Sequence, residues 1–418
     1  MDQAVTAKED ALRLYGEHIN AKRVDGWQRV GLGLVEHRRE GCYVWDADGT
    51  RYIDCFGGAG CFNVGRANPV IRQALIDAMA NEDLGDFMLI SDAKAQLAHR
   101  LSEITPGDLD YVMYGVGGGE VNDYAIKLAR GVTGKTDIIA MEQAYHGHTG
   151  FALGAIGRER YQAPFLPMVP GFLHVPFNDL AAVENAMTEN TAAIMLEPIL
   201  GEGGIHVASQ EFISGLRELC DRTGALLIFD EVQTAWGRTG KMFCSEHYGV
   251  VPDIMTVGKS LGGGIYPIAA AIFRRHLQPF NEAHPYIHLS TFGGSDLGCR
   301  VGLATIDYIL DEDLCGRSAS MGDLLMGKLR QLQSAHPQVM KEIRGKGLMI
   351  GLQFTDDAHG PRMTKLLAKR GILAIFSGNE TSVMRLMLPL IVDEDTVNEV
   401  ANGIGDAVAE LAERAAQG

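Results

Sequence analysis

Short runs of apolar residues recur through the middle of the chain. Each run is followed by a turn and then by apolar positions spaced as on one face of a helix. The runs lie between residues 65 and 275 and comprise Tyr111 to Val116, Asp137 to Met141, Ala192 to Leu196, Ala225 to Phe229, Asp253 to Val257 and Pro267 to Phe273. Strands that alternate with helices in this way are typical of an α/β fold with a mainly parallel sheet between helices.

Several of these runs end in polar or charged residues, namely Glu142, Glu197, Asp230 and Lys259. In open α/β sheets, ligands bind outside the carboxyl ends of the strands. We therefore expect the chemistry of this protein at that edge of the sheet.

The two ends of the chain have a different pattern. Strand-like segments at Gly347 to Phe354 and Met384 to Leu388 precede a final amphipathic helix, and Cys42 to Trp45 and Tyr52 to Ile53 flank a turn as in a hairpin. We expect a large domain over residues 65–300 and a smaller α+β domain over residues 301–418. The N-terminal segment, residues 1–64, is expected to join the smaller domain.

Composition narrows the class of partner. The 418 residues carry a formal net charge of −16 at pH 7, which disfavours nucleic acid and anionic membranes and leaves small molecules. The 51 glycines exceed the usual share of about 7% and predict tight turns and loops that approach a ligand closely. The seven cysteines are scattered, and the first residues lack the pattern of a signal peptide. We expect reduced thiols, no membrane span and a cytoplasmic location.

The segment Gly117-Gly118-Gly119 ends one apolar run and opens a helix. Free backbone amides at a helix start, with glycines that allow close approach, favour phosphate binding, although a glycine turn can also be purely structural. A dinucleotide-binding loop would need a third glycine where Glu120 stands, so the G-x-G-x-x-G pattern fails.

Two further runs deliver charged groups to the same edge. The run Ala225 to Phe229 is followed by Asp230, whose buried carboxylate needs a partner and could hold a pyridinium nitrogen protonated or cap a helix. Lys259 follows the next run and could act as an amine nucleophile that forms a Schiff base, or could be a solvated surface charge.

Taken together, these segments resemble the class III aminotransferases, enzymes of fold type I that use pyridoxal 5′-phosphate (PLP). The resemblance covers nearly the whole chain, and its segments occur in the family's order. They are Asn63-Val64-Gly65, Gly117 to Asn122, Tyr145-His146-Gly147, Glu197-Pro198-Ile199, Asp230-Glu231-Val232-Gln233-Thr234, Gly237-Arg238-Thr239-Gly240, Lys259, Ser290-Thr291-Phe292-Gly293-Gly294 and Arg344-Gly345-Lys346-Gly347-Leu348.

The resemblance implies a role for each matching residue. Lys259 would hold the cofactor as a Schiff base and shuttle a proton, and Asp230 would pair with the ring nitrogen. The remaining cofactor contacts that it implies are a ring-stacking aromatic, a helper behind the ring, an apolar contact on the other face and a donor to the phenolic oxygen, at Tyr145, His146, Val232 and Gln233 respectively.

The phosphate is expected to lie on Gly117, Gly118 and Gly119, joined by Thr291 from the second subunit of a homodimer. The family loop usually reads Ser-Gly-Ser or Ser-Gly-Ala. Here all three positions are glycine, so the backbone amides remain but a hydroxyl donor is lost.

Two residues bear on the substrate. Arg385 matches the arginine that grips the carboxylate of an amino or keto acid, and Glu202 resembles the glutamate that pairs with this arginine in ω-aminotransferases. The resemblance implies transfer of an amino group from an ω-amino acid, a diamine or another primary amine to pyruvate or 2-oxoglutarate.

Other reactions remain open on the same fold, namely those of a decarboxylating transaminase, an amino-acid racemase and an aminomutase. A nicotinamide-dependent dehydrogenase would leave Lys259, Gln233 and Thr291 unexplained, and a non-catalytic ligand-binding module is disfavoured by the intact lysine and aspartate. His146 and His148 have no carboxylate or cysteine at ligand spacing, so no metal site is expected.

Overall fold

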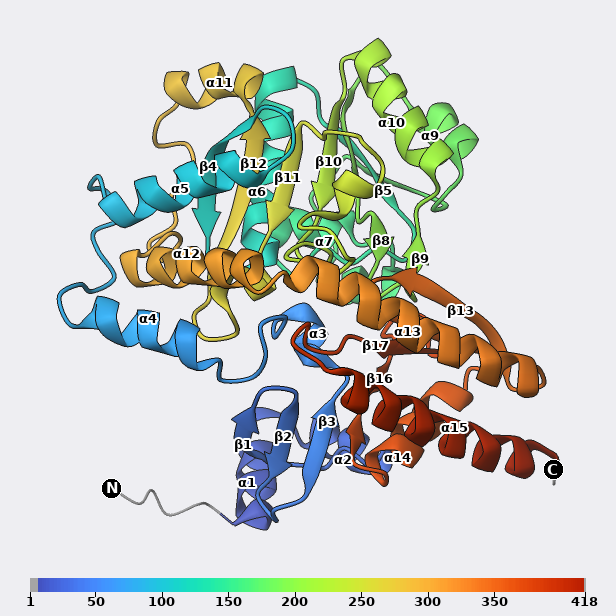
Figure 1. The fold of residues 1–418 in the computed structure, drawn as a ribbon. Coiled ribbons are helices and arrows are strands. Elements are labelled where there is room, and N and C mark those ends of the chain that lie inside the picture. Colours follow the sequence, from blue (N-terminus) through green and yellow to red (C-terminus); the bar gives the residue numbers. More distant parts are fainter. Residues whose placement is uncertain (1–6, 417–418) are drawn as a thin grey trace.

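The computed structural model describes residues 7–416, and its centre is a seven-stranded sheet (Figure 1). The strands run in the order β4 (Leu109–Gly115), β12 (Ala269–Arg274), β11 (Ile254–Val257), β10 (Leu226–Asp230), β7 (Thr191–Leu196), β5 (Asp137–Met141) and β6 (Phe172–Val175). β12 alone runs opposite to the other strands, and it pairs antiparallel with both β4 and β11. The mainly parallel sheet predicted from the apolar runs is thus confirmed, with β6 as a strand that the pattern did not reveal.

Both faces of this sheet are buried, which explains why its strands are apolar at successive positions. In β5, Ile138 and Ala140 belong to the apolar cluster under α6 (Gly118–Thr133), whereas Ile139 and Met141 belong to the cluster under α10 (Gln210–Thr223). Side chains of a strand alternate between its faces, so each face needs its own set of apolar residues.

Two long helices lead from the large sheet to the C-terminal part of the chain (Figure 1). They are α12 (Asp296–Asp311), which packs on α4 (Pro69–Met79) and α5 (Asp92–Ile104), and α13 (Leu314–Ala335). A four-stranded sheet follows, with the order β13 (Met340–Lys346), β14 (Met349–Phe354), β17 (Val383–Leu386) and β16 (Ile375–Phe376). The helices α14 (His359–Ala368) and α15 (Glu394–Ala416) pack against each other beside it.

The N-terminal segment forms a sheet with a C-terminal strand. Its order is β1 (Glu36–Glu40), β2 (Tyr43–Asp46), β3 (Arg51–Asp54) and β15 (Ile372–Leu373). The hairpin expected around residues 46–49 is present as β2 and β3, and β15 pairs in parallel with β3. Residues more than 300 positions apart in the chain are therefore joined by a strand ladder.

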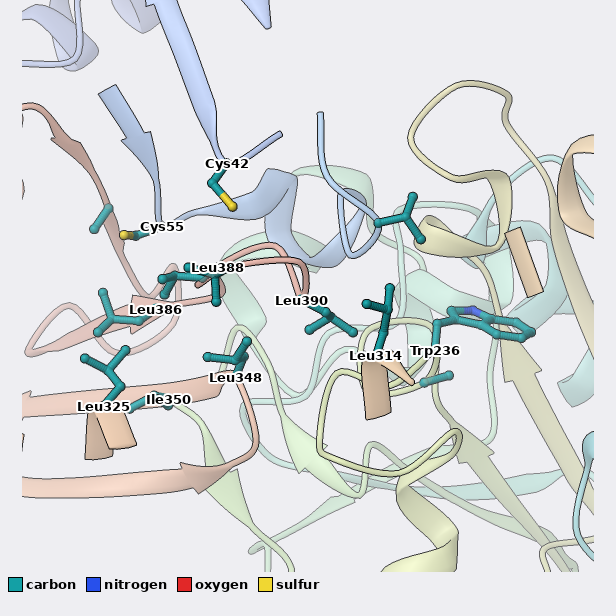
Figure 2. Close-up of a cluster of buried hydrophobic side chains, with 14 of the residues drawn as sticks. Cys42, Cys55, Trp236, Leu314, Leu325, Leu348, Ile350, Leu386, Leu388 and Leu390 are labelled. Carbon is teal, nitrogen blue, oxygen red and sulfur yellow. The ribbon is translucent and has the colours of Figure 1, made fainter. Parts of the chain in front are cut away.

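The largest apolar cluster links these parts of the molecule (Figure 2). Leu386, Leu388 and Leu390, on and after β17, lie close to Cys42 and Cys55 of the N-terminal segment. The same cluster includes Trp236, which follows β10 of the large sheet, together with Leu314 and Leu325 of α13. Burial of so much apolar surface at the junction holds the N- and C-terminal sheets firmly against the large one.

The remaining elements are short helices and strands on the surface or between the sheets. They are α1 (Lys8–Tyr15), η1 (Gly16–Asn20), α2 (Ala21–Arg29), α3 (Gly57–Gly60), α7 (Gly150–Ala155), α8 (Glu159–Gln162), η2 (Ala163–Phe165), α9 (Leu180–Ala186), β8 (Ile199–Leu200), β9 (His206–Val207), η3 (Cys244–His247), η4 (Lys259–Gly262), η5 (Arg275–Leu277) and α11 (Gln278–Ala283). Within residues 7–416, no helix combines the length and the apolar composition that a membrane crossing needs.

Candidate active site

The carboxyl ends of three neighbouring parallel strands bring charged side chains together. β10 ends at Asp230, β7 is followed by Glu197, and β11 is followed by Gly258 and Lys259. Asp230 pairs with Thr256 in the ladder between β10 and β11, so the aspartate and the lysine leave the sheet at the same edge. This is the edge at which open α/β sheets bind ligands.

A cavity of about 460 Å³ lies at this edge. The sequence-predicted residues that line it are Gly118, Gly119, Tyr145, His146, Glu202, Asp230, Val232, Gln233 and Lys259. A somewhat larger groove of about 520 Å³ lies between α14 and α15. We assign the active site to the cavity at the sheet edge, because it joins an amine, buried carboxylates and a helix start. Among the described residues, the larger groove is lined by basic and leucine side chains.

Asp230 is the centre of a buried hydrogen-bond network. His146 Nδ1 lies 2.7 Å from Asp230 Oδ2, and Asn122 Nδ2 donates to the same oxygen at 2.8 Å. The backbone N–H of Val232 donates to Asp230 Oδ1 at 3.0 Å. Thr256 Oγ1 donates to Asn122 Oδ1, which fixes the orientation of that amide. Asp230 is only 4% exposed, and these donors stabilise its charged form where water cannot.

Two groups beside Asp230 have displaced pKa values. Burial lowers the pKa of His146, but its hydrogen bond to Asp230 and the negative charge of that residue outweigh the loss of water, so the pKa lies above its usual value. Burial raises the pKa of Glu197 to about 7, against the opposing influence of His146. Glu197 accepts hydrogen bonds from the backbone N–H groups of Tyr145 at 2.9 Å and Gly201 at 3.0 Å. It thereby joins two loops that line the cavity.

At the glycine loop, the first turn of α6 faces the cavity with backbone that no side chain covers. The first N–H groups of α6 have no carbonyl partner within the helix, as at any helix start. A Cβ at Gly118 would lie 2.9 Å from Val232 Cγ1, and a Cβ at Gly119 would lie 2.9 Å from Thr149 Oγ1. Side chains are therefore excluded at both positions, and the start of α6 fits a phosphate group.

Lys259 lies in the cavity with a backbone that is unusual for a residue other than glycine. Its φ is +45°, in the left-handed region, at the first position of the 3₁₀ turn η4, which Gly258 caps. Such a conformation costs on the order of 1 kcal/mol and is often found at functional sites. Nearby, Gln233 Nε2 donates to the backbone oxygen of Ala59 at 2.9 Å, while the buried Gln233 Oε1 has no partner among the described residues.

The substrate end of the cavity holds an ion pair. Arg385 Nη1 of β17 donates to Glu202 Oε1, and Arg385 is 3% exposed. Arg385 does not line the cavity itself and reaches it through Glu202. The two residues that the sequence singled out for the substrate are thus in direct contact, although 183 positions separate them.

Two predicted cofactor residues lie outside the cavity of this single chain. Gly117 caps α6 just before the lining residues, with an extended φ of −157°. Thr291 is exposed on the segment that follows β12 and α11. Its predicted place in the site of a second subunit stays a prediction.

The sequence alone did not assign roles to residues that act by holding other residues of the site in place. Asn122 holds Asp230, and Glu197 holds two loops. The sequence placed Asn122 only within a matching segment, and it placed Glu197 at the end of an apolar run without giving it a role. Tyr161 also lines the cavity, where its ring packs near those of Tyr145 and His148 at centroid distances of 6.3 and 5.4 Å. A buried polar residue on an otherwise apolar helix face was the one available signal for Asn122.

Metal ligation has no candidate in the part of the chain that the structure describes. No group of three or more His, Cys, Asp or Glu side chains there is arranged to hold an ion. The fit of the cavity is instead to an organic cofactor that carries a phosphate, an aldehyde carbon for Lys259 and a basic ring nitrogen for Asp230.

Comparisons with known proteins agree with this geometry. The family model "Aminotransferase class-III" matches residues 27–408. An uncharacterized aminotransferase of Archaeoglobus fulgidus is 42% identical over 407 residues, which are 97% of this chain and 96% of that protein.

Solved structures of similar fold are aminotransferases as well. The ornithine aminotransferase of Toxoplasma gondii superposes with a TM-score of 0.91 at 28% identity, covering 98% of this chain and 97% of the other. A second structure of that enzyme, at 27% identity and a TM-score of 0.91, covers 98% of this chain and 96% of the other and is described with PLP at its active site. An (S)-enantioselective ω-transaminase of Thermomicrobium roseum has a TM-score of 0.88 at 28% identity, covering 97% and 99% of the two chains.

Proposed function

The chain belongs to the class III aminotransferases, which are PLP-dependent enzymes of fold type I, and from this premise we propose which amines it uses. The proposed donor is an ω-amino acid, a diamine or another primary amine, and the proposed acceptor is pyruvate or 2-oxoglutarate. The family, the fold, the enzyme class and the cofactor predicted from the sequence are confirmed by the comparisons. The donor and the acceptor are our inference.

The observation that carries the proposal is the meeting of Lys259, Asp230 and Glu202 in one cavity, with Arg385 behind the glutamate. Bound PLP supplies an aldehyde that takes up an amino group and a protonated ring that withdraws electrons from the reacting carbon. Lys259 Nζ would attach the cofactor and carry the proton at that carbon. The start of α6 at Gly118 and Gly119 would bind the phosphate.

Asp230 would keep the ring nitrogen protonated. Its carboxylate is held in place by His146, Asn122 and the N–H of Val232. A charged acceptor in a buried site interacts far more strongly with a cationic nitrogen than it would in water. Tyr145 and Val232 line the cavity and would enclose the two faces of the ring, and Gln233 would face its phenolic oxygen.

The pair of Glu202 and Arg385 supports a donor whose reacting end lacks a carboxylate. With the pair closed, the charge of Arg385 is neutralised, and the pocket can take the apolar carbons next to a primary amine. A keto acid would need the guanidinium for its own carboxylate, in a bidentate contact that arginine suits well. One pocket could then serve the amine in one half-reaction and the keto acid in the other.

The proposed assembly is a homodimer, in which Thr291 of one chain contributes to the phosphate site of the other. Supporting it, exposed apolar side chains gather on segment 84–90, where Leu89 is 68% exposed and Ile90 is fully exposed, and Phe292 beside Thr291 is 58% exposed. A hydrogen bond from Asp296 N, at the start of α12 just after Phe292, to Leu84 O joins this part of the chain to segment 84–90. Apolar patches of this kind mark interaction surfaces. A cytoplasmic location is part of the same proposal.

The test is a matrix of donors against acceptors. Diamines, ω-amino acids and simple alkyl amines are each paired with pyruvate and with 2-oxoglutarate, and alanine or glutamate formation is measured together with released carbon dioxide. The proposal predicts amino-acid formation from terminal amines without carbon dioxide. Activity confined to α-amino acids, or release of carbon dioxide in step with turnover, would overturn the proposed substrates.

A further inference from the structure

A turn between β16 and β17 touches Glu202 at three points. Ser377 Oγ donates to the backbone oxygen of Glu202, and Asn379 N donates to the same oxygen at 2.9 Å. Gly378 N donates to Glu202 Oε2 at 3.2 Å. The carboxylate is thus held on both oxygens, by Arg385 on Oε1 and by the turn on Oε2.

The turn is itself anchored by side chains from elsewhere in the chain. Arg158 Nη2 donates to the backbone oxygen of Asn379, and Arg160 Nη2 donates to Asn379 Oδ1 at 3.0 Å. Asn379 Nδ2 donates to the backbone oxygen of Gln143 at 2.9 Å. These contacts fix the middle of the turn against the loop that carries Tyr145.

The end of the turn is fixed by a cluster of charges. Glu380 Oε2 lies 2.8 Å from His206 Nε2, and Gln353 Nε2 donates to Glu380 Oε1 at 2.9 Å. The guanidinium of Arg344 lies 3.6 Å from the same carboxylate and donates to the backbone oxygen of Gly204, two residues after Glu202. The turn and the Glu202 loop are therefore braced against each other on both sides.

Arg385 depends on Glu202 for its charge partner. It is nearly fully buried, its only ion pair among the described residues is with Glu202, and its Nε has no partner there. A substrate carboxylate can reach Arg385 only if Glu202 leaves it. The apparent affinity for such a substrate is reduced by the fraction of molecules in which the pair is open.

We propose that the turn Ser377–Glu380 is a specificity-determining clamp, which holds the Glu202 carboxylate on Arg385 and so sets how readily a carboxylate-bearing substrate binds. The inference rests on the proposed function, in which Arg385 binds the keto acid. Residues of the turn act through Glu202 and are positioning residues. Because the clamp holds the pair closed, it favours amine donors and weakens carboxylate binding.

Gly378→Ala tests the clamp without a change of charge. A Cβ at Gly378 would lie 2.7 Å from Glu202 Oε2, the mobile end of a flexible side chain, so the carboxylate is pushed off the turn. The matched control is Gly327→Ala in α13, where a Cβ meets nothing within 4 Å. The probe is propanoate, an unreactive carboxylate, titrated into the PLP-loaded enzyme by isothermal calorimetry, with KM for pyruvate and for an alkyl amine measured in parallel.

We expect Gly378→Ala to tighten propanoate binding and lower KM for pyruvate by about threefold to tenfold, with KM for the alkyl amine raised and Gly327→Ala unchanged. Ser377→Ala removes one hydrogen bond to the Glu202 backbone. It should shift propanoate affinity and both KM values in the same direction, and it replaces Gly378→Ala if that variant does not fold. If the wild-type enzyme transaminates amines but Gly378→Ala binds propanoate no more tightly than wild type does, the clamp alone is overturned. If the wild-type enzyme does not transaminate amines, the clamp and the proposed function both fall.

Discussion

His146 Nδ1 and Asp230 Oδ2 lie 2.7 Å apart, with both side chains buried at the wall of the cavity. The raised pKa of His146 reflects this contact, which outweighs the effect of burial, and favours an imidazole that donates its Nδ1 proton to the carboxylate. The pair therefore keeps the Asp230 carboxylate oriented where a ring nitrogen would meet it. This relationship underlies the first prediction.

Asp230→Asn should lower kcat by at least about 100-fold, because the amide cannot stabilise a protonated ring nitrogen. The cofactor should still be retained through Lys259 and the glycine loop. The measurement is the initial rate with saturating donor and acceptor, with the cofactor quantified by its absorbance. Asp311→Asn, an exposed position at the end of α12, is the control. A variant with kcat within threefold of wild type would remove Asp230 from the mechanism.

Gly117→Ser should strengthen cofactor binding. The φ of −157° suits any residue, a Cβ there meets nothing within 4 Å, and serine adds a hydroxyl group that can donate to the phosphate. Titration of the apoenzyme with PLP should give a dissociation constant about threefold to tenfold lower. Gly118→Ser should act in the opposite direction, since its Cβ would lie 2.9 Å from Val232 Cγ1. Weaker binding by Gly117→Ser would contradict the placement of the phosphate.

Glu231 makes the stability of the fold depend on pH. Burial raises its pKa to about 7, although hydrogen bonds from Ser245, Cys244 and Thr234 oppose this, whereas an unfolded glutamate titrates near 4.5. Between these values the folded state binds more protons than the unfolded state, so stability falls as the pH rises. The gap corresponds to roughly 3 kcal/mol of stability, which is fully present below pH 4.5 and is lost as the pH rises to 7.

Thermal unfolding at several pH values between 5 and 8 tests the predicted loss of stability with rising pH. The melting temperature of wild type should fall more steeply with pH than that of Glu231→Gln, because groups common to both proteins cancel in the difference. Glu218→Gln, exposed on α10, should follow wild type. Equal slopes for wild type and Glu231→Gln would mean that Glu231 titrates normally in the folded protein.

Ile90→Asp should dissociate the proposed dimer. Ile90 is fully exposed in the single chain, and a carboxylate buried there against a second copy would be costly. Sedimentation should show a dimer for wild type and a monomer for the variant, with at least about a tenfold loss of activity. Leu173→Asp, on the edge strand β6 at the opposite end of the sheet, is the matched control. A dimeric and active Ile90→Asp would place the interface elsewhere.

The sequence predicted the parts of the fold that depend on local pattern. The strands of the large sheet were recognisable because both faces are buried, and Asp230 and Lys259 were recognisable because each follows such a strand. The edge strand β6 was missed because it is short and partly exposed, so it lacks a continuous apolar run. The division of the chain at residues 64 and 300 stays a prediction.

Contacts between distant parts of the chain could not be predicted. Only the tertiary fold brings these segments together. Examples are the pairing of β15 with β3, the hydrogen bond from Asn122 to Asp230 and the hydrogen bond from Ser377 to Glu202. A hydrogen bond between side chains leaves no periodic signal in the sequence. The contact of Glu202 with Arg385 was expected only because a family resemblance suggested it.

The most direct test of the central claim is the visible absorption spectrum of the purified protein and of Lys259→Ala, with Lys365→Ala as a control on α14. Wild type should be yellow, should bleach when a terminal amine is added and should regain its colour with pyruvate. Lys259→Ala should fail to complete this cycle, and Lys365→Ala should behave as wild type. A wild-type protein that gains no colour with added PLP, or a Lys259→Ala variant that cycles normally, would contradict an aminotransferase that works through Lys259.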